Sequence, residues 1–149
     1  MRLITREIDY AIRALSFMAQ NNHNSNVITV SELVRKLKTP RPFLRKILQI
    51  LNKKGLLHSS KGTGGGFRLV RSPGEISLND LVTIFHGRPK FNKCVFNKKI
   101  CPDIRTCPLK KKIENIEQYV MTELKAITLA SLLPKAKNEK RGHYARISQ

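Results

Sequence analysis

The sequence predicts a mainly α-helical fold with a small β-hairpin wing: a winged helix-turn-helix followed by a long C-terminal dimerisation helix. Two short helical patterns joined by a tight turn at Pro40 are typical of a helix-turn-helix. Two strand-like runs on either side of the glycine-rich segment 61–66 predict a β-hairpin. Apolar residues that recur every three or four positions over 109–133 predict the long helix.

Charge and hydropathy narrow the class of partner. The 149 residues include 29 Lys and Arg against 10 Asp and Glu, which gives a net charge of +19, and 40% are hydrophobic, enough for a core. No apolar run approaches the ~18 residues that span a bilayer, and the N-terminus lacks a signal-peptide core, so we expect a cytoplasmic protein. A polyanion is the expected partner: double-stranded DNA is favoured over an acidic membrane surface.

The first helix is predicted over residues 5–20, with Thr5 as its N-cap. The spacing of its apolar residues is that of one buried stripe. This stripe contains Ile8, Ala11, Ile12, Leu15 and Ala19.

Two short helices follow, and both have clear end signals. Thr29 and Glu32 form the capping box of a helix that ends at Leu37. The next helix is predicted over residues 42–53, and Gly55 provides its C-terminal stop.

This last helix has two different faces. Its core stripe is predicted to contain Phe43, Leu44, Ile47, Leu48 and Leu51. Its other face carries Arg41, Arg45, Gln49 and Asn52, with Lys46 and Lys53 beside them. Arg can bridge guanine O6 and N7, Gln can pair with adenine, and Lys neutralises phosphates, as a helix in the major groove requires. A solvated basic surface is the alternative, but the net charge, the turn and the hairpin favour DNA binding.

The wing is predicted from strands 56–60 and 67–71. Its glycines permit positive φ and a close approach of the backbone to DNA. A nucleotide-binding loop is disfavoured because the segment lacks the phosphate-loop spacing and opens no helix. Together with the turn and the helix above, the predicted DNA contacts are Thr39, Arg41, Arg45, Lys46, Gln49, Lys61, Thr63, Gly64, Gly65 and Arg68.

The rest of the chain divides into further segments. A short helix starts at the predicted N-cap Ser77, has Asp80 in its first turn and ends before Gly87. A helix over 109–133 would be about 40 Å long, more than a small winged domain can cover, so we expect it to contact a second copy. The predicted divisions are a DNA-binding domain (1–87), a cysteine loop (88–108), a dimerisation helix (109–133) and a flexible basic tail (134–149).

All three cysteines lie in the loop. Six residues separate Cys94 from Cys101, and five separate Cys101 from Cys107, longer gaps than in zinc knuckles. These gaps suit an iron–sulfur cluster, [4Fe–4S] or [2Fe–2S], or a redox-sensing thiol set; zinc binding and no function remain open. Three cysteines leave one coordination site open, and no histidine follows closely, so a carboxylate from elsewhere in the fold is the physical alternative.

Together these features resemble the Rrf-two family of winged-helix repressors, which includes the IscR, NsrR and RirA regulators. The resemblance covers Met1 to about Leu133 and includes the cysteine loop. The matching segments are Met1–Leu3, Asp9–Arg13, Arg41–Leu44, Gly64–Leu69 and Ile127–Leu132. The resemblance implies a homodimer joined along the long helix and a cluster whose state controls operator affinity.

The resemblance also implies a fourth ligand. In NsrR-like members an aspartate on the first helix of the partner subunit completes the cluster, and Asp9 occupies the matching place. The alternative is an ion pair of Asp9 with Arg13 at i+4. IscR-like members use a histidine three positions after the last cysteine, where this chain has Lys110. The cysteine gaps are slightly longer than in NsrR, which leaves the sensed signal open.

The sequence therefore predicts a dimeric DNA-binding repressor whose operator affinity is switched by an iron–sulfur cluster that senses nitric oxide, redox state or iron. The alternative is a cluster-free thiol-redox or zinc-binding regulator. We expect neither an enzyme nor a small-molecule substrate, because the four histidines show no spacing typical of a nucleophile and base. These histidines are His23, His58, His86 and His143.

Overall fold

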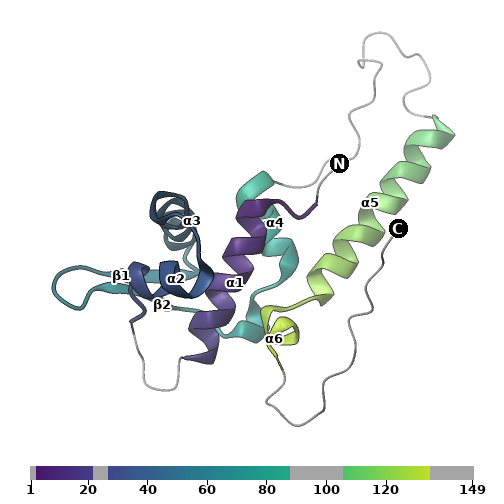
Figure 1. Ribbon diagram of the computed structural model, residues 1–149. Helices are drawn as coiled ribbons and strands as arrows, with labels where there is room; N and C mark the ends of the chain where they lie inside the picture. The colour runs from purple at the N-terminus through teal and green to yellow at the C-terminus, as the bar shows by residue number, and fades with distance from the viewer. Residues whose placement is uncertain (1–2, 22–26, 88–105, 135–149) are drawn as a thin grey trace, which may run out of the picture.

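The computed structural model describes residues 3–21, 27–87 and 106–134. The elements in these ranges are α1 (Arg6–Gln20), α2 (Val30–Leu37), α3 (Arg41–Lys53), β1 (Leu57–Ser60), β2 (Gly66–Leu69), a 3-10 turn η2 (Pro73–Glu75), α4 (Leu78–His86), α5 (Pro108–Ala126) and α6 (Leu129–Leu132). The β1–β2 hairpin projects from the side of the molecule away from α5 (Figure 1). The winged helix-turn-helix predicted from the sequence is confirmed.

Helix α1 lies at the centre of the core and contacts α2, α3, α4, α6 and β2. Of its predicted stripe, Ile8, Ala11 and Leu15 are fully buried, and Ile12 and Ala19 are partly buried. The stripe is completed by Ala14 and Met18, which the sequence analysis left out. The apolar face of α1 is therefore wider than predicted, because neighbours cover it from both sides.

The structure contains both capping boxes that the sequence predicts, at the start of α2 and at the start of α4. The Thr29 N–H donates to the Glu32 carboxylate at 2.7 Å, and the Glu32 N–H donates to the Thr29 hydroxyl at 3.2 Å. Ser77 and Asp80 repeat this arrangement at the start of α4. Thr5 occupies the N-cap position of α1, but its side chain makes no capping hydrogen bond.

The wing is attached to the segment that precedes α2. In the hairpin Leu57 pairs with Leu69 and Ser60 with Gly66 in antiparallel register. Ile28 and Phe67 exchange two backbone hydrogen bonds of 2.8 and 2.9 Å, so the hairpin gains a third, bridge-like neighbour. An isolated two-stranded hairpin is marginal in water, and this bridge supports it.

The prediction of one unbroken helix over 109–133 is wrong, because α5 ends at Ala126 and α6 begins at Leu129. The Leu78 N–H donates to the Ile127 carbonyl at 2.8 Å, and the Leu129 N–H donates to the Ile76 carbonyl at 2.7 Å. This pairing holds Ile127 and Thr128 extended, so the helix stops there. With 19 residues, α5 is about 28 Å long rather than 40 Å.

The apolar residues of α5 divide between two surfaces. Leu124 is buried and Val120 packs against the core. Leu109, Ile116 and Tyr119 are 69%, 55% and 67% exposed, and they form an apolar ridge along the outer side of α5. Among the described helices, none is long and apolar enough to cross a membrane.

Candidate nucleic-acid interface

A groove of about 670 Å³ lies between the start of α2, the exposed face of α3 and the wing. Six of the predicted DNA contacts line it: Arg41, Arg45, Gln49, Lys61, Gly64 and Gly65. The groove also takes in small polar residues that the sequence analysis did not assign: Ser31, Ser59 and Ser60. Asn52 lies on the same face, as its helical spacing predicts.

The burial of α3 determines which residues reach this groove. Leu44, Ile47, Leu48 and Leu51 are at most 1% exposed, so the opposite side of the helix faces solvent. Arg41, Arg45, Lys46 and Gln49 are all exposed there. Lys46 lies outside the groove, toward α1, where its charge contributes to lowering the pKa of Glu7.

The tip of the wing depends on glycine. Gly62 and Gly64 have φ of +94° and +78°, a region that other residues rarely adopt. A Cβ atom on Gly65 would lie 2.4 Å from the Ser60 carbonyl oxygen. The glycines therefore leave the backbone of the tip uncovered by side chains of their own. Beside it, the side chains of Lys61, Thr63 and Arg68 are exposed.

Thr39 differs from the other predicted contacts. It is 4% exposed, and its hydroxyl has no hydrogen-bond partner among the described residues. Lys38 adopts a left-handed conformation at φ +48°, and the turn buries Thr39. Unlike the other predicted contacts, Thr39 is therefore buried within the turn, and its contact with DNA stays a prediction.

Only part of the predicted metal site falls in the described residues. Cys107 is a free, half-buried cysteine at the N-cap of α5, while Cys94 and Cys101 lie outside the described residues. The Asp9 carboxylate, 44% exposed, accepts a hydrogen bond from Arg13 Nε at 2.9 Å. The ion pair named as the alternative for Asp9 is thus present. Within the described ranges, no three potential metal ligands come together.

A polar contact missed by the sequence analysis joins the end of α4 to the start of α1. The Thr5 hydroxyl lies 2.9 Å from Nε2 of His86. Hydrogen bonds from its own backbone N–H and from Thr5 lower the pKa of Glu7, with smaller contributions from His86 and Lys46. Residues 81 positions apart make this contact, so no local sequence pattern indicates it.

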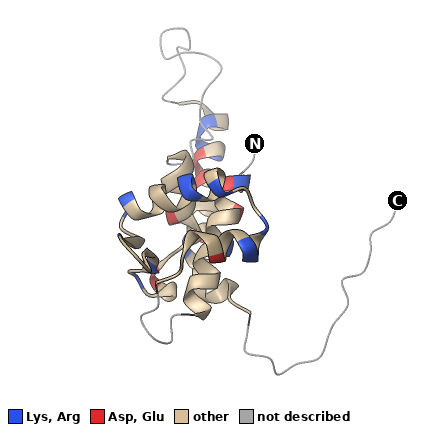
Figure 2. Cartoon of the chain, turned by 60° about the vertical axis from the view of Figure 1, so that its left-hand side comes forward, with Lys and Arg blue, Asp and Glu red and all other residues tan. Residues whose placement is uncertain are grey.

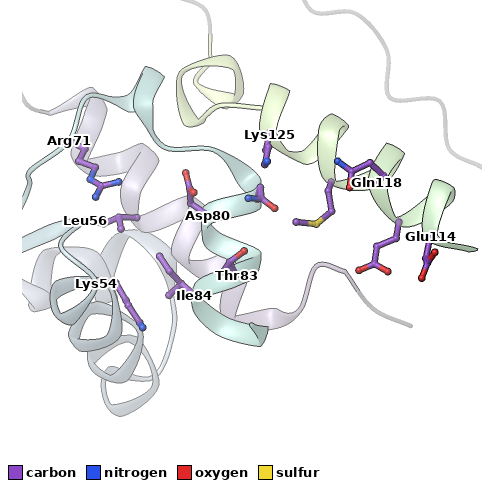
Figure 3. A pocket seen from close by; sticks show the side chains of 12 residues that line it. Lys54, Leu56, Arg71, Asp80, Thr83, Ile84, Glu114, Gln118 and Lys125 are labelled. Atoms are coloured by element: carbon purple, nitrogen blue, oxygen red, sulfur yellow. The ribbon is translucent and has the colours of Figure 1, made fainter. Parts of the chain in front are cut away.

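A second cavity, of about 620 Å³, lies between the base of the wing, α4 and α5 (Figure 3). Its lining mixes Lys54, Arg71 and Lys125 with Asp80 and Glu114. It shares no residue with the groove. Figure 2 shows blue Lys and Arg segments over several helices, with red Asp and Glu segments among them. Among the described residues, the lining of the groove contains Arg41, Arg45 and Lys61 and no acidic residue. For a polyanion, the groove is therefore the better candidate.

Comparison with known proteins gives a consistent family match. The model of the Rrf2 family, described as iron-dependent transcriptional regulator, matches residues 4–135. A protein of Aquifex aeolicus, predicted to be an HTH-type transcriptional regulator, is 30% identical over 128 residues, or 85% of this chain and 88% of that protein. A predicted Rrf2-like regulator of Rhodobacter capsulatus is 26% identical over 138 residues, 88% of this chain and 92% of its own.

Solved structures show the same fold. The chain is similar to IscR of T. potens with a TM-score of 0.64 and 23% identity, covering 87% of this chain and 84% of that one. CymR, the global cysteine regulator of B. subtilis, is similar with a TM-score of 0.70 and 21% identity, covering 89% of this chain and 96% of that one. The oxidised form of Staphylococcus aureus CymR is similar with a TM-score of 0.67 and 19% identity, covering 93% of this chain and 100% of that one.

Proposed function

Because the chain belongs to the Rrf2 family of DNA-binding transcriptional regulators, we propose that it is a homodimeric repressor whose operator affinity is switched by an iron–sulfur cluster. Members of this family are regulators rather than enzymes. The observation that carries the proposal is the groove, in which cations and amides of α3 face the glycine tip of the wing.

Helix α3 is the recognition helix in this proposal. Arg41, Arg45 and Gln49 are exposed on the side that lines the groove and supply the donors and acceptors that read base edges. Lys46, Lys61, Thr63 and Arg68, with the backbone of Gly64 and Gly65, contact phosphates, which positions the protein without reading sequence.

Two substitutions separate these roles. Arg45→Ala is expected to weaken operator binding by about 1–3 kcal/mol and to relax one base position, because the lost contact is to a base. Lys61→Ala is expected to weaken binding to all duplexes and to lower the salt slope by about one. Fluorescence anisotropy on operator and random duplexes measures both. Equal effects of the two variants on both duplexes would contradict the assignment of α3.

The candidate metal ligands have donor atoms that suit an iron–sulfur cluster. Three thiols at Cys94, Cys101 and Cys107 with the Asp9 carboxylate are a donor set suited to iron. Cys107 is free, and Asp9 retains a 44% exposed side chain despite its ion pair with Arg13. When bound, such a cluster supplies a centre that nitric oxide, oxygen or iron shortage can alter. Cys94, Cys101 and Cys107 would hold the cluster, with Cys107 at the start of α5, and the Asp9 carboxylate would be the fourth ligand in place of its ion pair with Arg13.

The cluster has a direct test. Protein purified without oxygen is expected to be brown, to contain iron and sulfide, and to lose both in Cys107→Ala. Asp9→Ala separates the two readings of this carboxylate, because a mere ion-pair role leaves the visible spectrum unchanged. Colourless protein that cannot be reconstituted would overturn the cluster.

A cluster-free thiol switch is the second candidate. It is favoured by the similarity to CymR, of which an oxidised form has been solved. The test is mild oxidation of iron-free protein. A disulfide between two of the three cysteines, found by mass spectrometry together with a change in DNA affinity, would support this candidate. Stoichiometric zinc would support the zinc-binding variant of this candidate.

A further inference from the structure

A cation on α1 lies beside the recognition helix on a pair of aromatic rings. The guanidinium carbon of Arg6 is 5.8 Å from the centroid of the Tyr10 ring and 5.5 Å from that of Phe43. The two rings pack edge to face, with centroids 5.5 Å apart and planes at 88°. We call these two rings the aromatic shelf. Since Phe43 belongs to α3, the shelf holds Arg6 against the element proposed to enter the major groove.

Arg6 keeps its charge available, although a second arginine uses the same ring. Arg13 also lies over Tyr10, at 6.0 Å, but its charge is paired with Asp9 at 2.9 Å. Within the described residues Arg6 has no acidic partner at ion-pair distance. Glu7 is its neighbour in sequence, but the Glu7 carboxylate is held by its own backbone N–H and by Thr5, which lowers its pKa.

The shelf lies on the flank of α3 away from the wing. Arg41 and Arg45 line the groove on the wing side. Phe43 is two positions from Arg41, which turns its side chain by about 200° around the helix, and it contacts Tyr10 of α1. Arg6 and the wing therefore lie on opposite flanks of α3. A duplex with α3 in its major groove, about 12 Å wide, presents a row of phosphates on each flank.

We propose that Arg6 binds a DNA phosphate on the α1 flank of α3, across the major groove from the wing. A guanidinium can donate hydrogen bonds from its edge to a phosphate while its face stays on an aromatic ring. The shelf also limits the rotamers of Arg6, which reduces the entropy lost on binding. The contact is to the backbone, so it adds affinity and register without sequence preference. This inference depends on the proposed DNA-binding function.

The salt dependence of binding to a random-sequence duplex tests the contact. Arg6→Ala is expected to reduce the slope of log K against log salt by about 0.9, the value for one phosphate contact. Affinity for random and operator duplexes is expected to fall by the same factor. Arg6→Lys keeps the charge and is expected to retain most of the slope. Circular dichroism verifies that each variant is folded.

The control is Lys111→Ala, which removes one exposed positive charge from the side of α5 about 200° around the helix from Leu109, away from the apolar ridge. Its slope is expected to stay close to that of the wild type. If Arg6→Ala and Lys111→Ala have the same slope while the wild type binds duplex DNA, the inference on Arg6 is overturned and the proposed function stands. A wild-type chain that binds no duplex would overturn both.

Discussion

The backbone at the tip of the wing leaves no room for a side chain at Gly65. A Cβ atom there would lie 2.4 Å from the Ser60 carbonyl oxygen and 2.9 Å from that of Gly62. Both neighbours are backbone atoms, which a rotamer change cannot move away. The requirement for glycine is therefore steric rather than a matter of flexibility.

Gly65→Ala is expected to distort the wing at a cost of about 1–3 kcal/mol. The variant is expected both to weaken DNA binding and to lower Tm. Gly74→Ala is the matched control, since its Cβ would meet nothing closer than the Ser72 hydroxyl at 3.9 Å. Thermal unfolding and anisotropy on one duplex compare the two variants. Equal affinity of Gly65→Ala and the wild type would show that the wing does not need this turn.

Residue types and spacing were enough to predict the face of α3, because one helix period determines which side chains lie together. Arg41, Arg45 and Gln49 line the groove as that period requires. The burial of Thr39 was not predictable from its residue type, since it sits in a turn in which Lys38 is left-handed. Arg6 was missed because the ring of Phe43 lies 37 positions away in sequence and only the fold brings the two together.

At the scale of elements, the start of α2 depends on one reciprocal pair. The Glu32 carboxylate accepts from the Thr29 N–H at 2.7 Å, and Thr29 accepts from the Glu32 N–H. Thr29→Ala removes half of this box and is expected to cost about 1 kcal/mol of unfolding free energy. Thr122→Ala, in the exposed middle of α5, is expected to be close to neutral. Urea unfolding measures both, and equal losses would contradict the role of the box.

The same pair gives α2 a dependence on pH. Hydrogen bonds from Thr29 hold the pKa of Glu32 below its ordinary value of 4.5. Because the folded pKa is lower than the unfolded one, this stabilisation is fully present above pH 4.5 and is lost as pH falls through the folded pKa. The acid limb of stability is therefore expected to be shallower in Glu32→Gln, measured by unfolding at a series of pH values. An unchanged limb would contradict this.

Element boundaries were predictable where the signal is local. The boxes at Thr29 and Ser77 are four-residue patterns, and both form. The break between α5 and α6 was not predictable, because apolar spacing continues through it. Backbone pairing of Ile127 and Leu129 with residues 76 and 78, about 50 positions earlier, ends the helix, and periodicity contains no trace of such a pairing.

At the scale of the whole molecule, the apolar ridge of Leu109, Ile116 and Tyr119 is the proposed surface between two copies. Ile116→Glu is expected to give monomers and to weaken operator binding, because the two recognition helices are no longer joined. Gln118→Glu adds the same charge about 200° around α5 and is expected to stay dimeric. Sedimentation velocity distinguishes the two. A persistent dimer in Ile116→Glu would place the interface elsewhere.

The pairing that ends α5 also fixes the C-terminal end of that helix to the rest of the fold. Its C-terminal end is tied by backbone hydrogen bonds to the start of α4, while its first residue follows Cys107. A rod of about 28 Å that is fixed at one end converts a tilt of about 5° into a displacement of about 2 Å at the other. The end of α5 that follows Cys107 is thus the end that a tilt of the helix would displace most.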